Sequence, residues 1–153
     1  MKEKLLISGC LAGLSCRYDG GSLPHPSLDD LKMQYDLIPV CPEQAGGLST
    51  PRIPNELQAS ATEILSGRGK VKNQAGEDCT QQFIRGATET VYIVRLLEIK
   101  IALLKDGSPS CGKNRVYDGS FSGKSITGRG ITAEMLHKEG VDIYSEDEMD
   151  QLL

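Results

Sequence analysis

The sequence has no tryptophan, only two phenylalanines and no apolar run near the roughly 20 residues that cross a bilayer. We therefore expect no membrane-spanning segment. The amino-terminal stretch MKEKLLISG starts basic, but its apolar part is too short for a secretory signal peptide, so we expect a cytoplasmic protein. Basic residues are not in excess either, since the chain has 17 Lys and Arg and 21 Asp and Glu. The net charge of −4 disfavours a broad phosphate-binding surface and favours a small ligand.

Paired metal-binding motifs are absent as well. The five cysteines are an odd number and form no CxxC pair, so neither a disulfide framework nor a zinc ribbon is indicated. The only histidines are His25 and His137, in a loop and a helical pattern, and both are expected to be surface residues. With 153 residues, of which 39% are hydrophobic, residues 1–153 are expected to form a single domain that buries a core without disulfides.

Hydrophobic periodicity predicts the architecture. Short apolar runs between turn residues are typical of strands buried in a parallel sheet, and helical patterns separate them. The segment TEILSGRGKVK at 62–72 predicts a small hairpin that turns at 67–69. The expected fold is a three-layer α/β/α domain with a mainly parallel, Rossmann-like sheet and a small β-hairpin insertion. The expected strands are 4–9, 37–41, 99–104 and 141–144, and the expected helices are 27–35, 79–97, 132–139 and 146–153.

Three cysteines, Cys10, Cys41 and Cys111, each lie where a predicted strand ends. Because the carboxyl ends of parallel strands share one edge of a sheet, we expect their thiols to gather there. Three thiolates supply three of the four ligands of a tetrahedral metal or a cubane iron–sulfur cluster, which leaves one position open for chemistry. Cys16 is the other candidate ligand, whereas Cys79, at a helix start, is expected to be structural.

A short Tyr-Asp-Gly sequence occurs twice, at Tyr18 after the first strand and at Tyr117 after the third. Asp-Gly pairs are common in turns, so both copies are explained by local turn formation alone. The alternative is that these two loops form walls of one pocket.

Several longer motifs together resemble the DUF523 family, which includes the thiouracil desulfidases known as TudS. The resemblance covers essentially the whole chain, and the motifs follow the family's order. They are ISGCL at 7–11, CRYDGG at 16–21, VCPE at 40–43, GGLSTPR at 46–52, SPSCG at 108–112 and YDGSFSGK at 117–124.

The resemblance implies an enzyme with a [4Fe-4S] cluster held by three cysteines, whose fourth iron is open to the sulfur of a thiolated pyrimidine. In this family's chemistry, 2- or 4-thiouracil becomes uracil and hydrogen sulfide by a non-redox, hydrolytic C–S cleavage of hydrolase or lyase type. Cys10, Cys41 and Cys111 are the ligands that carry over. Cys16 also lies in a family motif and stays a rival for one position.

The neighbours of these cysteines are the candidate catalytic and substrate-binding residues. Glu43, two residues after Cys41, is the expected general base, since a partly dry pocket raises a carboxyl pKa towards neutrality. Ser108 and Ser110 would bind the pyrimidine or relay a proton, and the sequence does not separate them. Arg17 would hold a carbonyl or a departing anion, and Tyr18 would stack on the base.

Two other classes of function stay open at the level of sequence. In one, the thiolates bind zinc or a purely structural cluster, and the domain is a non-catalytic binding module. In the other, one cysteine thiolate is the nucleophile of a metal-free sulfurtransferase. Among substrates, the acidic balance favours a free thiolated pyrimidine over thiouridine in tRNA.

Overall fold

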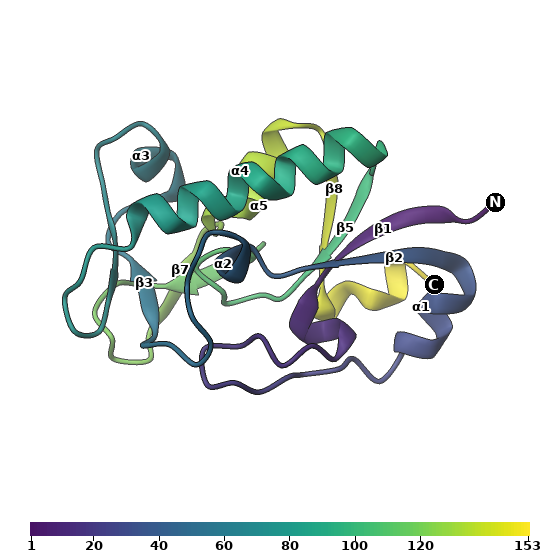
Figure 1. The fold of residues 1–153 in the computed structure, drawn as a ribbon, viewed down its shortest axis with the longest axis horizontal. Helices are drawn as coiled ribbons and strands as arrows, with labels where there is room; N and C mark the ends of the chain where they lie inside the picture. Colours follow the sequence, from purple (N-terminus) through teal and green to yellow (C-terminus); the bar gives the residue numbers. More distant parts are fainter.

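A computed structural model describes residues 1–153. Its central sheet has four parallel strands in the order β2-β1-β5-β8, which Figure 1 shows as a fan beside the two chain termini. The predicted strands and their parallel arrangement are confirmed. Their bounds are Glu3–Ser8 for β1, Tyr35–Val40 for β2, Ile101–Leu104 for β5 and Asp142–Ser145 for β8.

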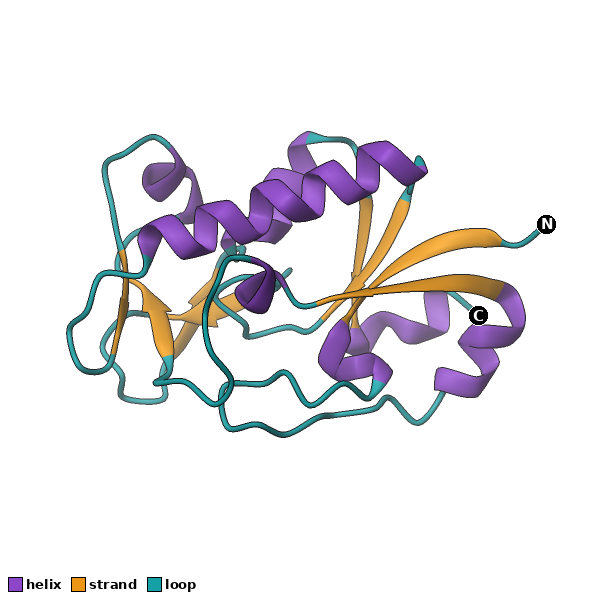
Figure 2. Cartoon of the chain, in the orientation of Figure 1, coloured by secondary structure: helices purple, strands orange, loops and turns teal.

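Helices cover both faces of the sheet, so the three-layer prediction is also confirmed (Figure 2). On one face lie α4 (Thr80–Leu97) and α5 (Ile131–Lys138), and on the other lie α1 (Leu28–Gln34) and η2 (Glu146–Gln151). The last of these is a 3-10 helix instead of the expected α-helix. Side chains alternate between the faces, since Leu6 packs towards α4 and α5 while Leu5 and Ile7 pack towards α1 and η2. None of the helices is long and apolar enough to cross a membrane.

The predicted hairpin exists, but its position was wrong. The segment that was expected to form its first strand is helical, as α3 (Ala61–Leu65). The reason is a capping box, in which Ser60 accepts from the Glu63 backbone and the Glu63 side chain accepts from the Ser60 backbone. The antiparallel pair is instead β3 (Asn55–Leu57) with β4 (Val71–Asn73), so α3 lies inside the connection.

A second antiparallel hairpin was not predicted. It joins β6 (Arg115–Tyr117) to β7 (Ser125–Thr127), in the stretch between 104 and 132 for which the sequence predicted neither strand nor helix. The Asp118-Gly119 pair between two short alternating segments was the available signal. The two hairpins lie together, away from the main sheet, in the left half of Figure 1.

A short helix, α2 (Pro42–Ala45), begins directly after β2 and holds Glu43 in its first turn. Pro42 at the first helical position explains why a helix starts here. α2 packs on α4 through two glycines: a Cβ built on Gly86 would lie 1.8 Å from the Pro42 carbonyl oxygen, and one on Gly46 1.9 Å from the Gln82 carbonyl oxygen. The backbone after β2 is thus held in close contact with the long helix α4.

Candidate active site

A cavity of about 390 Å³ opens at the carboxyl edge of the sheet. The chain leaves β1 for β2 on one side and reaches β5 on the other, so the strand order reverses there. Such a reversal is where open α/β sheets bind ligands. The volume lies within the range of small-molecule sites, roughly 300–1,000 Å³.

Four of the five thiols line this cavity, as Cys10, Cys16, Cys41 and Cys111. Cys10 lies in η1 (Gly9–Ala12) after β1, Cys41 caps α2 after β2, and Cys111 lies in the loop after β5. The structure therefore brings the three predicted thiols together. It also places Cys16 with them, whereas Cys79 is buried at the start of α4 in a separate core cluster.

Cys16 and Cys41 are direct neighbours. The Cys41 Sγ donates to the carbonyl oxygen of Cys16 at 3.6 Å. Burial raises the pKa of Cys16 to about 12, and the nearby Cys41 and Cys10 add to the increase. By position alone, Cys16 stays a rival ligand.

The other two thiols are also shifted towards the protonated form. Burial raises the pKa of Cys10, although Lys105 and Arg17 act in the opposite direction. Burial likewise raises the pKa of Cys111, against a hydrogen bond from Ser8. No three Cys, His, Asp or Glu side chains are arranged as a ligand set for a single metal ion. The thiols instead border a shared space.

Glu43 and Arg52 form a largely buried ion pair on the cavity wall. The Arg52 Nη2 donates to the Glu43 Oε2 at 2.8 Å, and the side chains are 5% and 16% exposed. Burial raises the pKa of Glu43, and the charge and hydrogen bond of Arg52 oppose that increase.

The two candidate serines lie in different environments. Ser108 lines the cavity, and its Oγ accepts hydrogen bonds from the backbone N–H groups of Ser110 and Cys111 at 3.1 and 3.0 Å. Ser110 is 1% exposed, lies outside the cavity lining, and pairs its hydroxyl with that of Thr132 at 2.7 Å. The structure therefore separates what the sequence did not, and Ser108 alone faces the site.

Asp106 organises the loop that carries Ser108 and Cys111. Its Oδ1 accepts hydrogen bonds of 3.0–3.1 Å from four backbone N–H groups, and its Oδ2 pairs with the Arg115 guanidinium at 3.3 Å. Burial alone would raise the pKa of Asp106, but these N–H groups and Arg115 bring it below its usual value. The N–H donors are those of Gly107, Lys113, Asn114 and Arg115.

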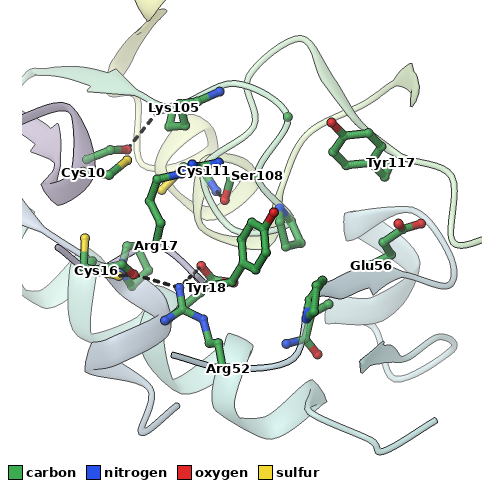
Figure 3. Close-up of a pocket in the computed structure, with 18 of the residues that line it drawn as sticks. Cys10, Cys16, Arg17, Tyr18, Arg52, Glu56, Lys105, Ser108, Cys111 and Tyr117 are labelled. Atoms are coloured by element: carbon green, nitrogen blue, oxygen red, sulfur yellow. Dashed lines mark hydrogen bonds and ion pairs between the residues drawn. The ribbon is translucent and has the colours of Figure 1, made fainter. Parts of the chain in front are cut away.

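Both Tyr-Asp-Gly loops form walls of the cavity, with Tyr18 and Tyr117 each among its lining residues. The turn explanation holds as well, because Asp19 Oδ1 accepts from the Gly21 backbone and Asp118 Oδ1 from that of Ser120. Arg17 lines the cavity beside Tyr18, with its guanidinium 5.6 Å from the ring centroid. Figure 3 shows Tyr18, Arg17 and Ser108 between the thiols and Tyr117.

Sequence reasoning missed the wall that the first hairpin contributes. Asn55 and Glu56 of β3 line the cavity, and in Figure 3 Glu56 lies across it from Cys10 and Cys16. The Glu56 Oε1 accepts from the backbone N–H groups of Gly119 and Phe121, at 2.9 and 3.1 Å, and so fixes the second Tyr-Asp-Gly loop. A sequence prediction that placed the hairpin strand at β3 would have pointed to these two residues.

Fold and site together define a class: an α/β protein with a small-molecule cavity at the strand-order reversal, built on cysteine sulfur with a carboxylate and a hydroxyl beside it. The chain belongs to the 2-thiouracil desulfurase family, whose model matches residues 5–148.

Two relatives have nearly the same extent as this chain. The first is YbbK of Bacillus subtilis (strain 168), described as uncharacterized, which is 38% identical over 150 residues, or 97% of this chain and 99% of YbbK. The second is the solved structure of TudS, described as a [4Fe-4S]-dependent thiouracil desulfidase. It is 41% identical with a TM-score of 0.88, and the match covers 99% of this chain and 95% of TudS.

Proposed function

We propose that this protein is a [4Fe-4S]-dependent desulfidase that converts a thiolated pyrimidine, such as 2- or 4-thiouracil, and water into uracil and hydrogen sulfide. The observation that carries the proposal is that Cys10, Cys41 and Cys111 follow three adjacent parallel strands and line one cavity with Glu43. The family and the 41% identity to TudS support it.

The donor set suits such a cluster. Each cysteine of a cubane cluster binds a different iron, so its ligands surround a larger body than a single ion, as these thiols surround a shared cavity. Three thiolates add negative charge, and Lys105 and Arg17 are the cations that act on Cys10. When bound, the cluster would supply an iron with an open position, whose affinity for soft sulfur polarises the C–S bond.

The side chains around the cavity would carry out the rest of the reaction. Glu43, with one oxygen fixed by Arg52, would accept a proton from the attacking water. The Ser108 oxygen already accepts two backbone hydrogen bonds, so its own proton is available to the heterocycle or the departing group. Arg17 would stabilise negative charge as sulfide leaves, and Tyr18 would stack on the ring.

The environment of the thiols argues against the metal-free sulfurtransferase. A cysteine nucleophile needs a lowered pKa, but burial raises the pKa of three of the four cavity thiols, Cys10, Cys16 and Cys111. Cluster-loaded protein that releases no sulfide from a thiolated pyrimidine would favour the non-catalytic alternative, because the Glu43–Arg52 ion pair and the Ser108 hydroxyl also serve the fold.

Anaerobic reconstitution with iron and sulfide, followed by incubation with 2-thiouracil and 4-thiouracil, tests the proposal. Release of uracil and sulfide in equal amounts is expected from the cluster-loaded protein and not from the metal-free one. Zinc binding without iron, or a loaded protein that turns over neither compound, would contradict the assignment.

A further inference from the structure

Asn55, the first residue of β3, has an unused hydrogen-bond acceptor in the cavity wall. The residue is 8% exposed and lines the cavity. Its Nδ2 donates to the carbonyl oxygen of Ile53 at 3.3 Å, which fixes the orientation of the amide, and its Oδ1 is buried without a partner. The chain has only three such buried side-chain atoms, on Arg52, Asn55 and Ser145, and the first two belong to cavity-lining residues.

The same hairpin holds a matched asparagine for comparison. Asn73 of β4 pairs with Asn55 in the strand register and is 7% exposed. Its Oδ1 accepts from the backbone N–H groups of Ala75 and Glu77, both at 3.0 Å, and its Nδ2 donates to the Glu77 Oε1 at 2.9 Å. Asn73 is therefore used fully by the fold and lies outside the cavity lining, whereas Asn55 lines the cavity and keeps one buried acceptor without a partner.

An unpaired buried acceptor destabilises the fold, so an apolar side chain of similar size would suit this position better if it had no other role. A carboxamide oxygen only accepts hydrogen bonds, so its partner must carry an N–H or O–H group. Oδ1 is buried in the structure, and the terminal torsion of asparagine is soft, so a rotation that gives up the 3.3 Å bond to Ile53 would turn Oδ1 towards a group in the cavity.

We propose that Asn55 is a specificity-determining residue whose Oδ1 accepts a hydrogen bond from a ring N–H of the bound heterocycle. This inference rests on the proposed function, which directs the substrate sulfur to the cysteines. The opposite part of the ring then faces the hairpin wall, where Asn55 precedes Glu56 (Figure 3). The residue would select thiolated lactams with a free ring N–H over their N-alkylated forms.

Binding of the unreactive product to the cluster-loaded protein tests this directly. Uracil, 1-methyluracil, 3-methyluracil and uridine would be titrated by anaerobic calorimetry into the wild type, Asn55→Leu and the control Asn73→Ala. The wild type should bind uracil and disfavour one of the two methyl derivatives. Asn55→Leu should weaken the binding of uracil roughly 5- to 100-fold, as expected for loss of one buried hydrogen bond. This variant should also bind uracil and that methyl derivative equally well.

The melting temperature distinguishes a role of Asn55 in substrate recognition from a role in supporting the fold. Asn55→Leu removes an unpaired buried acceptor and loses only the 3.3 Å hydrogen bond to the carbonyl of the exposed Ile53, so its melting temperature should stay at or above the wild-type value. Asn73→Ala loses three hydrogen bonds, so it should lower the melting temperature and leave the methyl discrimination intact. A lower melting temperature for Asn55→Leu with unchanged uracil binding would overturn the inference. A loss confined to uridine, which would indicate a sugar hydroxyl, or a wild type that binds none of the four compounds, would also overturn it.

The test is independent of turnover. Binding that depends on Asn55 in a protein that releases no sulfide from thiouracil would retain the inference and reject the proposed function. Turnover of thiouracil by a protein whose uracil affinity does not depend on Asn55 would support the proposed function and reject the inference.

Discussion

The guanidinium of Arg52 ties the Glu43 carboxylate to the loop that follows β1. Its Nη2 donates both to the Glu43 Oε2 at 2.8 Å and to the Cys16 carbonyl oxygen at 3.0 Å. Its Nη1 is held by the Ser49 carbonyl and the Thr50 hydroxyl. A carboxylate held in this way is fixed relative to the thiols that share its cavity.

Arg52→Gln should therefore lower kcat roughly 10- to 100-fold, the effect expected when a catalytic group loses its position. Cluster content, measured by iron analysis, should stay close to that of the wild type. Arg52→Lys keeps the charge without the forked contacts, so its kcat should be intermediate. Arg68→Gln, on the exposed turn after α3, is the control. An unchanged kcat in Arg52→Gln would show that Glu43 needs no such anchor.

The two serines should differ in what their loss affects. Ser108→Ala removes a hydroxyl from the cavity, so turnover should fall by roughly 100-fold or more if it takes part in proton transfer. Ser110→Ala breaks a buried hydroxyl pair with Thr132, so it should lower stability by about 1–2 kcal/mol and leave turnover per bound cluster near the wild-type value. Kinetics normalised to iron content and thermal unfolding of both variants check this, and the opposite pattern would assign the active hydroxyl to Ser110.

In Gly86→Ala, helix propensity and the packing of α2 on α4 should change the stability of the protein in opposite directions. In an exposed helix interior the change would stabilise by about 1 kcal/mol. Here the added Cβ would lie 1.8 Å from the Pro42 carbonyl oxygen, so α2 must shift away from α4. We expect a lower melting temperature and lower iron content, because Cys41 and Glu43 lie at the start of α2. Glu89→Ala, exposed on the same helix, is the matched control. A more stable Gly86→Ala protein would contradict the observed packing.

Asp106 should make stability depend on pH. Its pKa in the folded protein is below the value of about 3.9 for an unfolded chain, so its stabilisation is present above that pH and is lost as pH falls through the folded pKa. Asp106→Asn should lower stability at pH 7 by about 1–3 kcal/mol and flatten the acid side of the curve. Denaturant unfolding between pH 7 and pH 3 measures both effects, with Asp30→Asn on exposed α1 as the control. Identical slopes for Asp106→Asn and the wild type would remove this role.

Much of the fold could be predicted because the main strands are short apolar runs and α4 has clear helical periodicity. The meeting of Cys10, Cys41 and Cys111 followed from one rule about the edge of a parallel sheet. The error at α3 came from the two glycines after it, which suggested a turn between strands. The capping box of Ser60 and Glu63 instead stabilises a helix there.

The rest of the site depends on contacts between distant segments. Nothing local marks Asn55 or Glu56 as cavity residues. β3 is placed at the cavity by its pairing with β4 and by the hydrogen bond from the Gly119 backbone to Glu56. The difference between Ser108 and Ser110 depends on α5, which presents Thr132 to one of them. Neighbours that come from other elements cannot be read from a single segment.

In the proposed function, Cys10, Cys41 and Cys111 hold the cluster and Cys16 stays a free thiol beside it. Iron and acid-labile sulfide per chain, measured after anaerobic reconstitution of the five single Cys→Ser variants, test it most directly. We expect about four of each in the wild type, Cys16→Ser and Cys79→Ser, and large losses in the other three variants. Loss of iron in Cys16→Ser, with retention in any one of the other three, would contradict it.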